Sequence, residues 1–145
     1  MINASRSIII NAPVNDVFPF LTQGENNKKW RNDVLKISLV SGKSDAVGAT
    51  YKQVLSGPFG QKIAGDYKVT EYKKNDTLGF EIIAGPARPK GVYKVEQTKE
   101  GTKLSFALSL EPSGFMMKLM TPMIQKQMEK EMENLSKLKT AIESE

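Results

Sequence analysis

The chain of 145 residues is long enough for one ordinary domain with a substantial core, and we expect a single domain over residues 1–145. It contains neither cysteine nor histidine, which excludes disulfides, thiolate nucleophiles, cysteine or imidazole zinc sites and Ser-His-Asp catalysis. The net charge of +5 comes from 21 basic and 16 acidic side chains interspersed along the chain, which is typical of a solvated surface rather than of nucleic-acid binding.

The N-terminal segment predicts one strand followed by two short helices. Residues 5–10 end in a β-branched run and stop at Asn11-Ala12-Pro13, the pattern of a strand closed by a turn. Apolar side chains then recur at helical spacing over residues 14–21, after a proline that suits the start of a helix. The polar residues 23–29 predict a second short helix or turn that ends near Trp30.

Residues 34–110 show the period of two that is typical of half-buried strands. The clearest case is residues 104–110, where four large apolar side chains alternate with serine and alanine. Turn clusters such as Gly57-Pro58 and Glu100-Gly101 separate the runs. We count six strands in this region, and with the first strand they predict a seven-stranded antiparallel meander that has one apolar face.

Helical periodicity returns after Pro112. Residues 115–120 form a first apolar segment, Thr121-Pro122 restarts or kinks the helix, and one apolar stripe continues to Ile142. A helix from Phe115 to Ile142 measures roughly 42 Å at about 1.5 Å per residue. Because no other predicted element is long enough to cover the sheet, we expect an α+β fold with a curved sheet wrapped around this helix.

Three motifs in this order support a family resemblance. A strand runs into Ala12-Pro13 and a helix with Val17-Phe18, Val47-Gly48-Ala49-Thr50 precedes a strand, and Leu135-x-x-Leu138-Lys139 lies near the end of the chain. Over nearly its whole length the chain resembles the START-like or Bet v 1-like helix-grip superfamily (SRPBCC), which includes polyketide cyclases and dehydrases. The resemblance implies two short helices after strand 1 and a cavity between the sheet and the C-terminal helix, with no cofactor and no metal.

Six of the seven methionines lie between Met116 and Met132. Flexible thioether side chains suit a cavity that accepts variable apolar ligands, although they also fill irregular cores. Since the resemblance supplies a cavity beside this helix, we expect four residues near the Pro122 kink to line it: Met116, Met120, Met123 and Ile124.

The alternation also assigns aromatic side chains to the inward face of the strands, namely Tyr51, Tyr67, Phe80, Tyr93 and Phe106. A buried tyrosine offers an apolar ring and a hydroxyl that needs a partner. Gln53 points inward among them and needs a hydrogen bond from the protein, from water or from a ligand. We expect all six residues to line the cavity, with Tyr67 and Tyr93 as weak catalytic candidates.

Three further residues are candidates for the cavity rim. Arg88 lies in the stiff loop Gly85-Pro86-Ala87-Arg88-Pro89, where it holds an anionic ligand group or is simply solvated, and it is the third weak catalytic candidate. Phe59 lies between a proline and a glycine in a segment that forms either a lid or a plain hairpin tip. Trp30 anchors the short helices or touches the ligand.

Two functions remain open from the sequence. The first is binding, transport or sequestration of a small hydrophobic or amphipathic molecule; the alternative is a cofactor-free polyketide cyclase or dehydratase. Because no inward carboxylate or lysine is evident, binding is favoured. No stretch approaches the ~20 apolar residues that span a bilayer, and the first ten residues lack the pattern of a signal peptide. We therefore expect a cytoplasmic protein that is a monomer or a weak homodimer.

Overall fold

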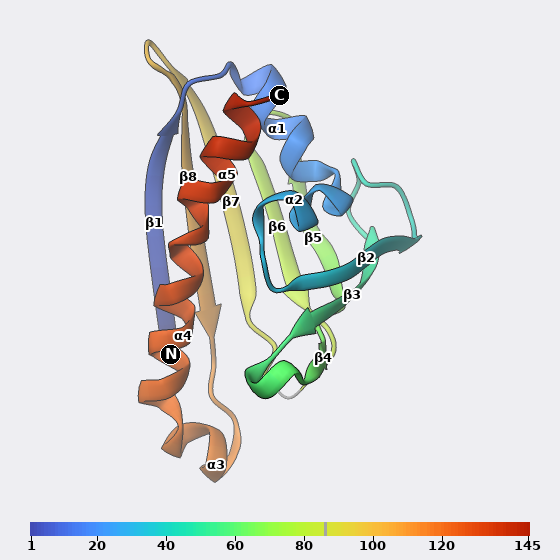
Figure 1. Ribbon diagram of the computed structural model, residues 1–145, viewed down its shortest axis with the longest axis vertical. Helices are drawn as coiled ribbons and strands as arrows, with labels where there is room; N and C mark the ends of the chain where they lie inside the picture. Colours follow the sequence, from blue (N-terminus) through green and yellow to red (C-terminus); the bar gives the residue numbers. More distant parts are fainter. Residues whose placement is uncertain (86) are drawn as a thin grey trace.

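A computed structural model describes residues 1–85 and 87–145. Figure 1 shows a curved sheet, a helical rod that runs along β1 and β8, and two short helices gathered at one end. The strands are β1 (Ile2–Ile10), β2 (Val34–Ser41), β3 (Thr50–Ser56), β4 (Lys62–Ala64), β5 (Tyr67–Lys73), β6 (Thr77–Ile82), β7 (Lys90–Thr98) and β8 (Gly101–Leu110). The helices are α1 (Val14–Thr22), α2 (Asn27–Trp30), α3 (Gly114–Leu119), α4 (Thr121–Met132) and α5 (Asn134–Glu143), with short 3-10 turns η1 (Gly24–Asn26) and η2 (Pro58–Gly60).

The sheet is antiparallel with the order β1-β8-β7-β6-β5-β3-β2, and β4 pairs with β3. The alternation in sequence runs unbroken from Ile63 to Thr70 and predicts one strand there, but the structure has two, β4 and β5. The described residues therefore form eight strands where seven were predicted. The break falls at Gly65 and Asp66, which bond to the backbone of the neighbouring strand: Gly65 N donates to Gln53 O, and Gln53 N donates to an Asp66 carboxylate oxygen. The helix-grip architecture is confirmed.

Strand alternation places the predicted side chains in the core. Leu104, Phe106, Leu108 and Leu110 are all buried, as the period of two predicts. The chain reverses into β8 at Gly101, whose φ of +132° favours glycine. A Cβ at Gly101 would also lie 3.2 Å from the backbone nitrogen of Ala12, so the bare glycine allows β8 to start against the β1–α1 connection.

The C-terminal rod consists of three helical segments. α4 and α5 pack against β1 and bury Met128, Met132, Leu135, Leu138 and Ile142, which confirms the predicted stripe over this part. The helix is interrupted at Met120, just before the predicted Thr121-Pro122 restart, and again at Glu133. α3 buries none of its residues. In Figure 1, α3 lies at the lower end of the molecule, beyond the strands that α4 and α5 cover.

Candidate functional site

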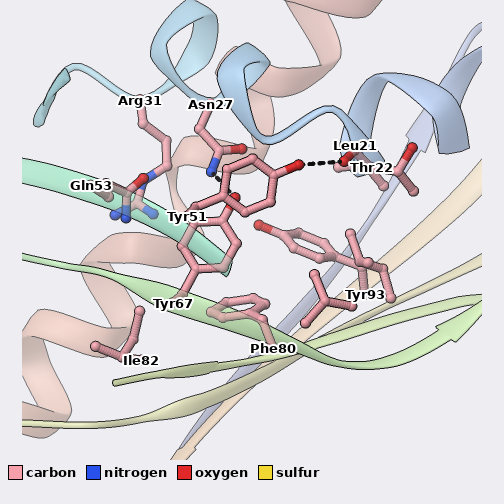
Figure 2. A pocket seen from close by; sticks show the side chains of 12 residues that line it. Leu21, Thr22, Asn27, Arg31, Tyr51, Gln53, Tyr67, Phe80, Ile82 and Tyr93 are labelled. Carbon is pink, nitrogen blue, oxygen red and sulfur yellow. Dashed lines mark hydrogen bonds between the residues drawn. The ribbon is translucent and has the colours of Figure 1, made fainter. Parts of the chain in front are cut away.

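A pocket lies between the inner face of the sheet and the α1–α2 segment. Its cavity volume is about 30 Å³, which holds roughly one water molecule, so side chains of the protein fill most of the interior. Figure 2 shows these side chains converging from the strands and from the helical segment. The lining residues are Leu21, Thr22, Asn27, Arg31, Tyr51, Gln53, Tyr67, Val69, Leu78, Phe80, Ile82 and Tyr93.

An unbroken row of aromatic rings crosses the sheet at this pocket. Tyr51 and Tyr67 stack with ring centroids 4.9 Å apart, and Tyr67 meets the edge of Phe80 at 5.6 Å. Phe80 lies 6.0 Å from Tyr93, which stacks on Phe106 at 4.2 Å. Phe106 supports this row from β8 but does not line the pocket. The predicted inward face of β3, β5, β6, β7 and β8 therefore becomes an apolar wall of aromatic rings in contact with each other.

The tyrosine hydroxyls differ in their partners. The Tyr51 hydroxyl donates to Thr22 O at 3.3 Å and accepts from Gly24 N at 3.2 Å, so it joins β3 to the end of α1. The Tyr67 hydroxyl accepts from Asn27 Nδ2 at 3.3 Å. Among the described residues, the Tyr93 hydroxyl has no hydrogen-bond partner. Burial raises the pKa of all three phenols, so at neutral pH they stay protonated and act as donors.

Gln53 carries a polar group without a partner into the same pocket. The side chain is only 1% exposed, and its Nε2 donates to Gly65 O at 3.1 Å. Its Oε1 accepts no hydrogen bond from any of the described residues. A buried carbonyl oxygen without a donor costs about 1–3 kcal/mol. The side chain therefore presents a hydrogen-bond acceptor that a bound molecule can satisfy.

Arg31 is the charged pocket residue that the sequence analysis missed, and the uncharged lining residues that it also missed are Leu21, Thr22, Asn27, Val69, Leu78 and Ile82. Arg31 Nη2 donates to Asp33 Oδ2 and to Glu131 Oε2, at 3.1 Å in each case. Its Nε atom is buried and has no partner among the described residues. Burial lowers the pKa of the guanidinium, but Glu131 and Asp33 outweigh this effect and the pKa is raised. Only the proximity of Arg31 to Asp33 and Trp30 was visible in sequence, because Glu131 lies 100 residues away.

Five of the six residues that were expected to line the cavity do line this pocket, and Phe106, which packs behind Tyr93, does not. Tyr51, Gln53, Tyr67, Phe80 and Tyr93 line one pocket, and their role in ligand binding stays a prediction.

The methionines expected to line the cavity do not line this pocket. Met116 and Met123 are 65% and 64% exposed, and Met120 is 42% exposed. Ile124 packs against the core, outside the pocket lining. The physical reason is that α3 and the start of α4 extend past the strands, so apolar side chains at helical spacing find no sheet surface to cover. The buried methionines are Met128 and Met132, further along the helix.

The three rim candidates also lie outside the pocket lining. Trp30 is buried at the end of α2, directly before Arg31. Phe59 is fully exposed on η2, with a φ of +59°. Arg88 is exposed, and its Nε donates to Gly85 O within its own loop at 3.2 Å. Residue 86 of that loop lies outside the described residues.

The pocket lies under the α1–α2 segment and not, as expected, between the sheet and the C-terminal helix, since no residue of α3, α4 or α5 lines it. A curved antiparallel sheet that grips a C-terminal helix defines the helix-grip class of proteins. The model of the family described as "Polyketide cyclase / dehydrase and lipid transport" matches residues 1–141. The chain belongs to this family. No protein with a curated description matches the sequence.

Solved structures share the fold at low sequence identity. A START superfamily protein from Mycobacterium smegmatis is similar at 14% identity and a TM-score of 0.80, with 99% of both chains covered. The di-domain aromatase/cyclase StfQ of the steffimycin biosynthetic pathway matches at 14% identity and a TM-score of 0.77, over 99% of this chain and 51% of StfQ. Ara h 8.0201 matches at 13% identity and a TM-score of 0.71, over 99% of this chain and 98% of that protein.

The part of the chain that the structure describes has neither a metal cluster nor a membrane-spanning helix. Within residues 1–85 and 87–145, no group of three or more acidic side chains is placed to hold a metal ion. Over the same residues, none of the helices has the length and apolar character needed to cross a bilayer.

Proposed function

We propose that the protein binds a small hydrophobic or amphipathic molecule in the pocket between the sheet and the α1–α2 segment. The observation that carries this proposal is the unpartnered Gln53 Oε1, held at 1% exposure beside a wall of stacked aromatic rings. Apolar walls with a few convergent polar groups are typical of small-molecule sites. Family membership and the similarity to START and Bet v 1 structures support the same function.

The polar atoms define the ligand chemistry. A ligand hydroxyl or amine would donate to Gln53 Oε1, and a ligand carbonyl would accept from the protonated Tyr93 hydroxyl. Flat rings would stack against the aromatic row as the tyrosines stack on each other. The proposed ligand is therefore a planar aromatic molecule that carries both a hydroxyl and a carbonyl.

Binding requires the pocket to open, because about 30 Å³ is far below the volume of such a ligand. The α1–α2 segment is held over the strands by the hydrogen bonds from Tyr51 to Thr22 and Gly24 and from Asn27 to Tyr67. Outward movement of this segment would break a few hydrogen bonds worth about 1 kcal/mol each. It would also expose part of the apolar side chains that α1 and α2 bury, namely Val17, Phe18, Phe20, Leu21 and Trp30. The free energy of the ligand contacts has to exceed the free energy of opening. Flat ligands are favoured because their rings can stack on the aromatic row.

A polyketide cyclase or dehydratase is the second candidate, and the observation that favours it is Arg31. A guanidinium that lines the pocket could polarise a ligand carbonyl. However, Asp33 and Glu131 already share this cation, and the buried phenols have raised pKa values that make them poor bases at neutral pH. An aldol closure needs a base to remove the carbon-bound proton, so binding is favoured over catalysis.

The test measures ligand affinity with variants that remove one polar group. We expect hydroxyanthraquinones and hydroxyflavones to raise the melting temperature and to bind in calorimetry. Tyr93→Phe and Gln53→Met should each weaken binding about fivefold, the equivalent of one lost hydrogen bond of about 1 kcal/mol. Tyr72→Phe is the matched control, because Tyr72 lies on β5 but does not line the pocket.

Two results would decide against the proposal. Unchanged affinity in both pocket variants would show that the ligand binds elsewhere. The absence of any thermal shift with both ligand classes would contradict the proposed binding function.

Incubation with a linear polyketone separates the two candidate functions. Recovery of the polyketone with unchanged mass and unchanged retention time supports binding. A new isomer of the same mass identifies an aldol cyclase, and loss of one water identifies a dehydratase.

A further inference from the structure

The strongest feature outside the pocket is an apolar surface at the α3 end of the C-terminal rod. Five large apolar side chains are exposed there, by 42% to 78%. No residue of α3 is buried, although four of its six residues are large and apolar. A helix with this composition normally buries its apolar stripe against another element. We call this surface the tip patch; it consists of Phe115, Met116, Leu119, Met120 and Met123.

The tip patch is one continuous face and not scattered exposure. Its members follow each other at steps of one, three, one and three residues, the spacing that places side chains on one side of a helix. The break at Met120 keeps this register, because Met120 N donates to Met116 O and Ile124 N donates to Met120 O, as in a continuous helix. Met117 and Ile124, on the other side, pack against the core. The apolar side chains that do not pack against the core therefore lie together on the solvent-exposed face of this segment.

The charged side chains within the segment that carries the tip patch are positive. Residues 112–128 contain the exposed Lys118 and Lys126 and no acidic residue, and the exposed Glu111 and Glu129 lie directly outside this segment. Apolar side chains flanked by lysines are typical of helices that lie in the interface of an anionic bilayer. In Figure 1, α3 is the element furthest along the long axis at its end, so a flat surface can approach it without meeting the sheet.

We propose that the tip patch docks on anionic lipid membranes, with α3 and the start of α4 inserted among the headgroups. A second copy of the chain fits less well. Symmetric contact through the patch would bring two copies of Lys118 together among the apolar side chains, whereas Glu111 and Glu129 lie at the borders of the segment and not within it. This proposal rests on the exposed apolar side chains and the lysines of α3 and α4, and it does not depend on the ligand pocket.

Flotation with lipid vesicles tests this directly. We expect the full chain to float with vesicles of equal parts phosphatidylcholine and phosphatidylglycerol, and much less with pure phosphatidylcholine. Phe115→Ser combined with Leu119→Ser should lower the partition coefficient at least about tenfold, because two largely exposed apolar side chains no longer enter the interface. Lys118→Gln and Lys126→Gln should each lower it about fivefold, and added salt should weaken binding further.

The matched control is Val40→Ser with Val47→Ser, which removes two apolar side chains that are 58% and 61% exposed away from the tip. This control should float like the unchanged protein. Because all these positions are exposed, thermal unfolding should change little in every variant. Equal flotation of the tip variant and the control would overturn the proposal. A concentration-dependent dimer in sedimentation velocity that Phe115→Ser/Leu119→Ser abolishes, without vesicle binding, would overturn it in favour of self-association.

Discussion

Arg31 should contribute far more to stability than its partner Glu131, although the two share one ion pair. Arg31→Met keeps an unbranched side chain of similar length but removes the cation at 3.1 Å from both Asp33 and Glu131. Two carboxylates, 30% and 23% exposed, then face each other without a counter-charge. Breaking a fully buried pair costs about 3–5 kcal/mol. Because water still reaches these groups, we expect about 2–3 kcal/mol.

Glu131→Gln removes the other side of the same contact with a small loss, below about 1 kcal/mol. Burial raises the pKa of Glu131 and the charge of Arg31 opposes this, so the site disfavours the ionised carboxylate on balance. The amide oxygen can still accept from Arg31, and Asp33 remains to pair with it. The two substitutions therefore separate two free energies: the cost of leaving a charge unpaired, and the contribution of the Arg31–Glu131 ion pair to stability.

Urea unfolding at neutral pH measures both variants, and thermal melting provides a second readout. At about 3 °C per kcal/mol for a chain of this length, Arg31→Met should melt roughly 6–9 °C below the unchanged protein and Glu131→Gln within about 3 °C of it. Equal losses of unfolding free energy in the two variants would show that the destabilisation comes from losing the ion pair itself, and not from leaving two carboxylates without a counter-charge. A loss below about 1 kcal/mol for Arg31→Met would refute the role assigned to the cation.

Two further predictions concern the same region. Gly24→Ala should destabilise the fold by about 1–3 kcal/mol, because its Cβ would lie 2.5 Å from the Tyr67 hydroxyl and 2.6 Å from Tyr51 Cζ; unchanged thermal melting would contradict this packing. The raised pKa of Glu131 means that the folded state holds the proton more tightly than the unfolded chain. As pH rises from the ordinary glutamate pKa of about 4.3 through the raised value, the unchanged protein should therefore lose stability relative to Glu131→Gln. Urea titrations at several pH values check this, and a pH-independent difference would contradict it.

Local periodicity was enough to predict most of the fold. Alternation along β8 identified its buried face, because successive side chains of a strand point to opposite sides. The same rule placed Tyr51, Tyr67 and Tyr93 on the inner surface before any contact was known. The split between β4 and β5 was not visible, because the alternation continues through Gly65 and Asp66, and only their bonds to Gln53 on the adjacent strand show the break.

The candidate site was only partly predictable, and Arg31 shows why. Its neighbours in sequence are a buried tryptophan and a nearby aspartate, which do not distinguish it from other surface arginines. Its position depends on Glu131, which α4 brings to the α2–β2 corner from the far end of the chain. Arg88, which looked more distinctive between two prolines, is exposed and bonds within its own loop.

The amino-acid sequence by itself determined which side chains share a face, since that depends only on the 2.0- and 3.6-residue periods of the backbone. Tertiary structure decided which faces meet. Met116 and Met120 have the same four-residue spacing as Met128 and Met132, yet the first pair is exposed and the second is buried. The difference arises because the C-terminal rod extends past the strands that it covers. How far the rod extends depends on where it packs on the sheet, and this is set by contacts between residues far apart in the chain.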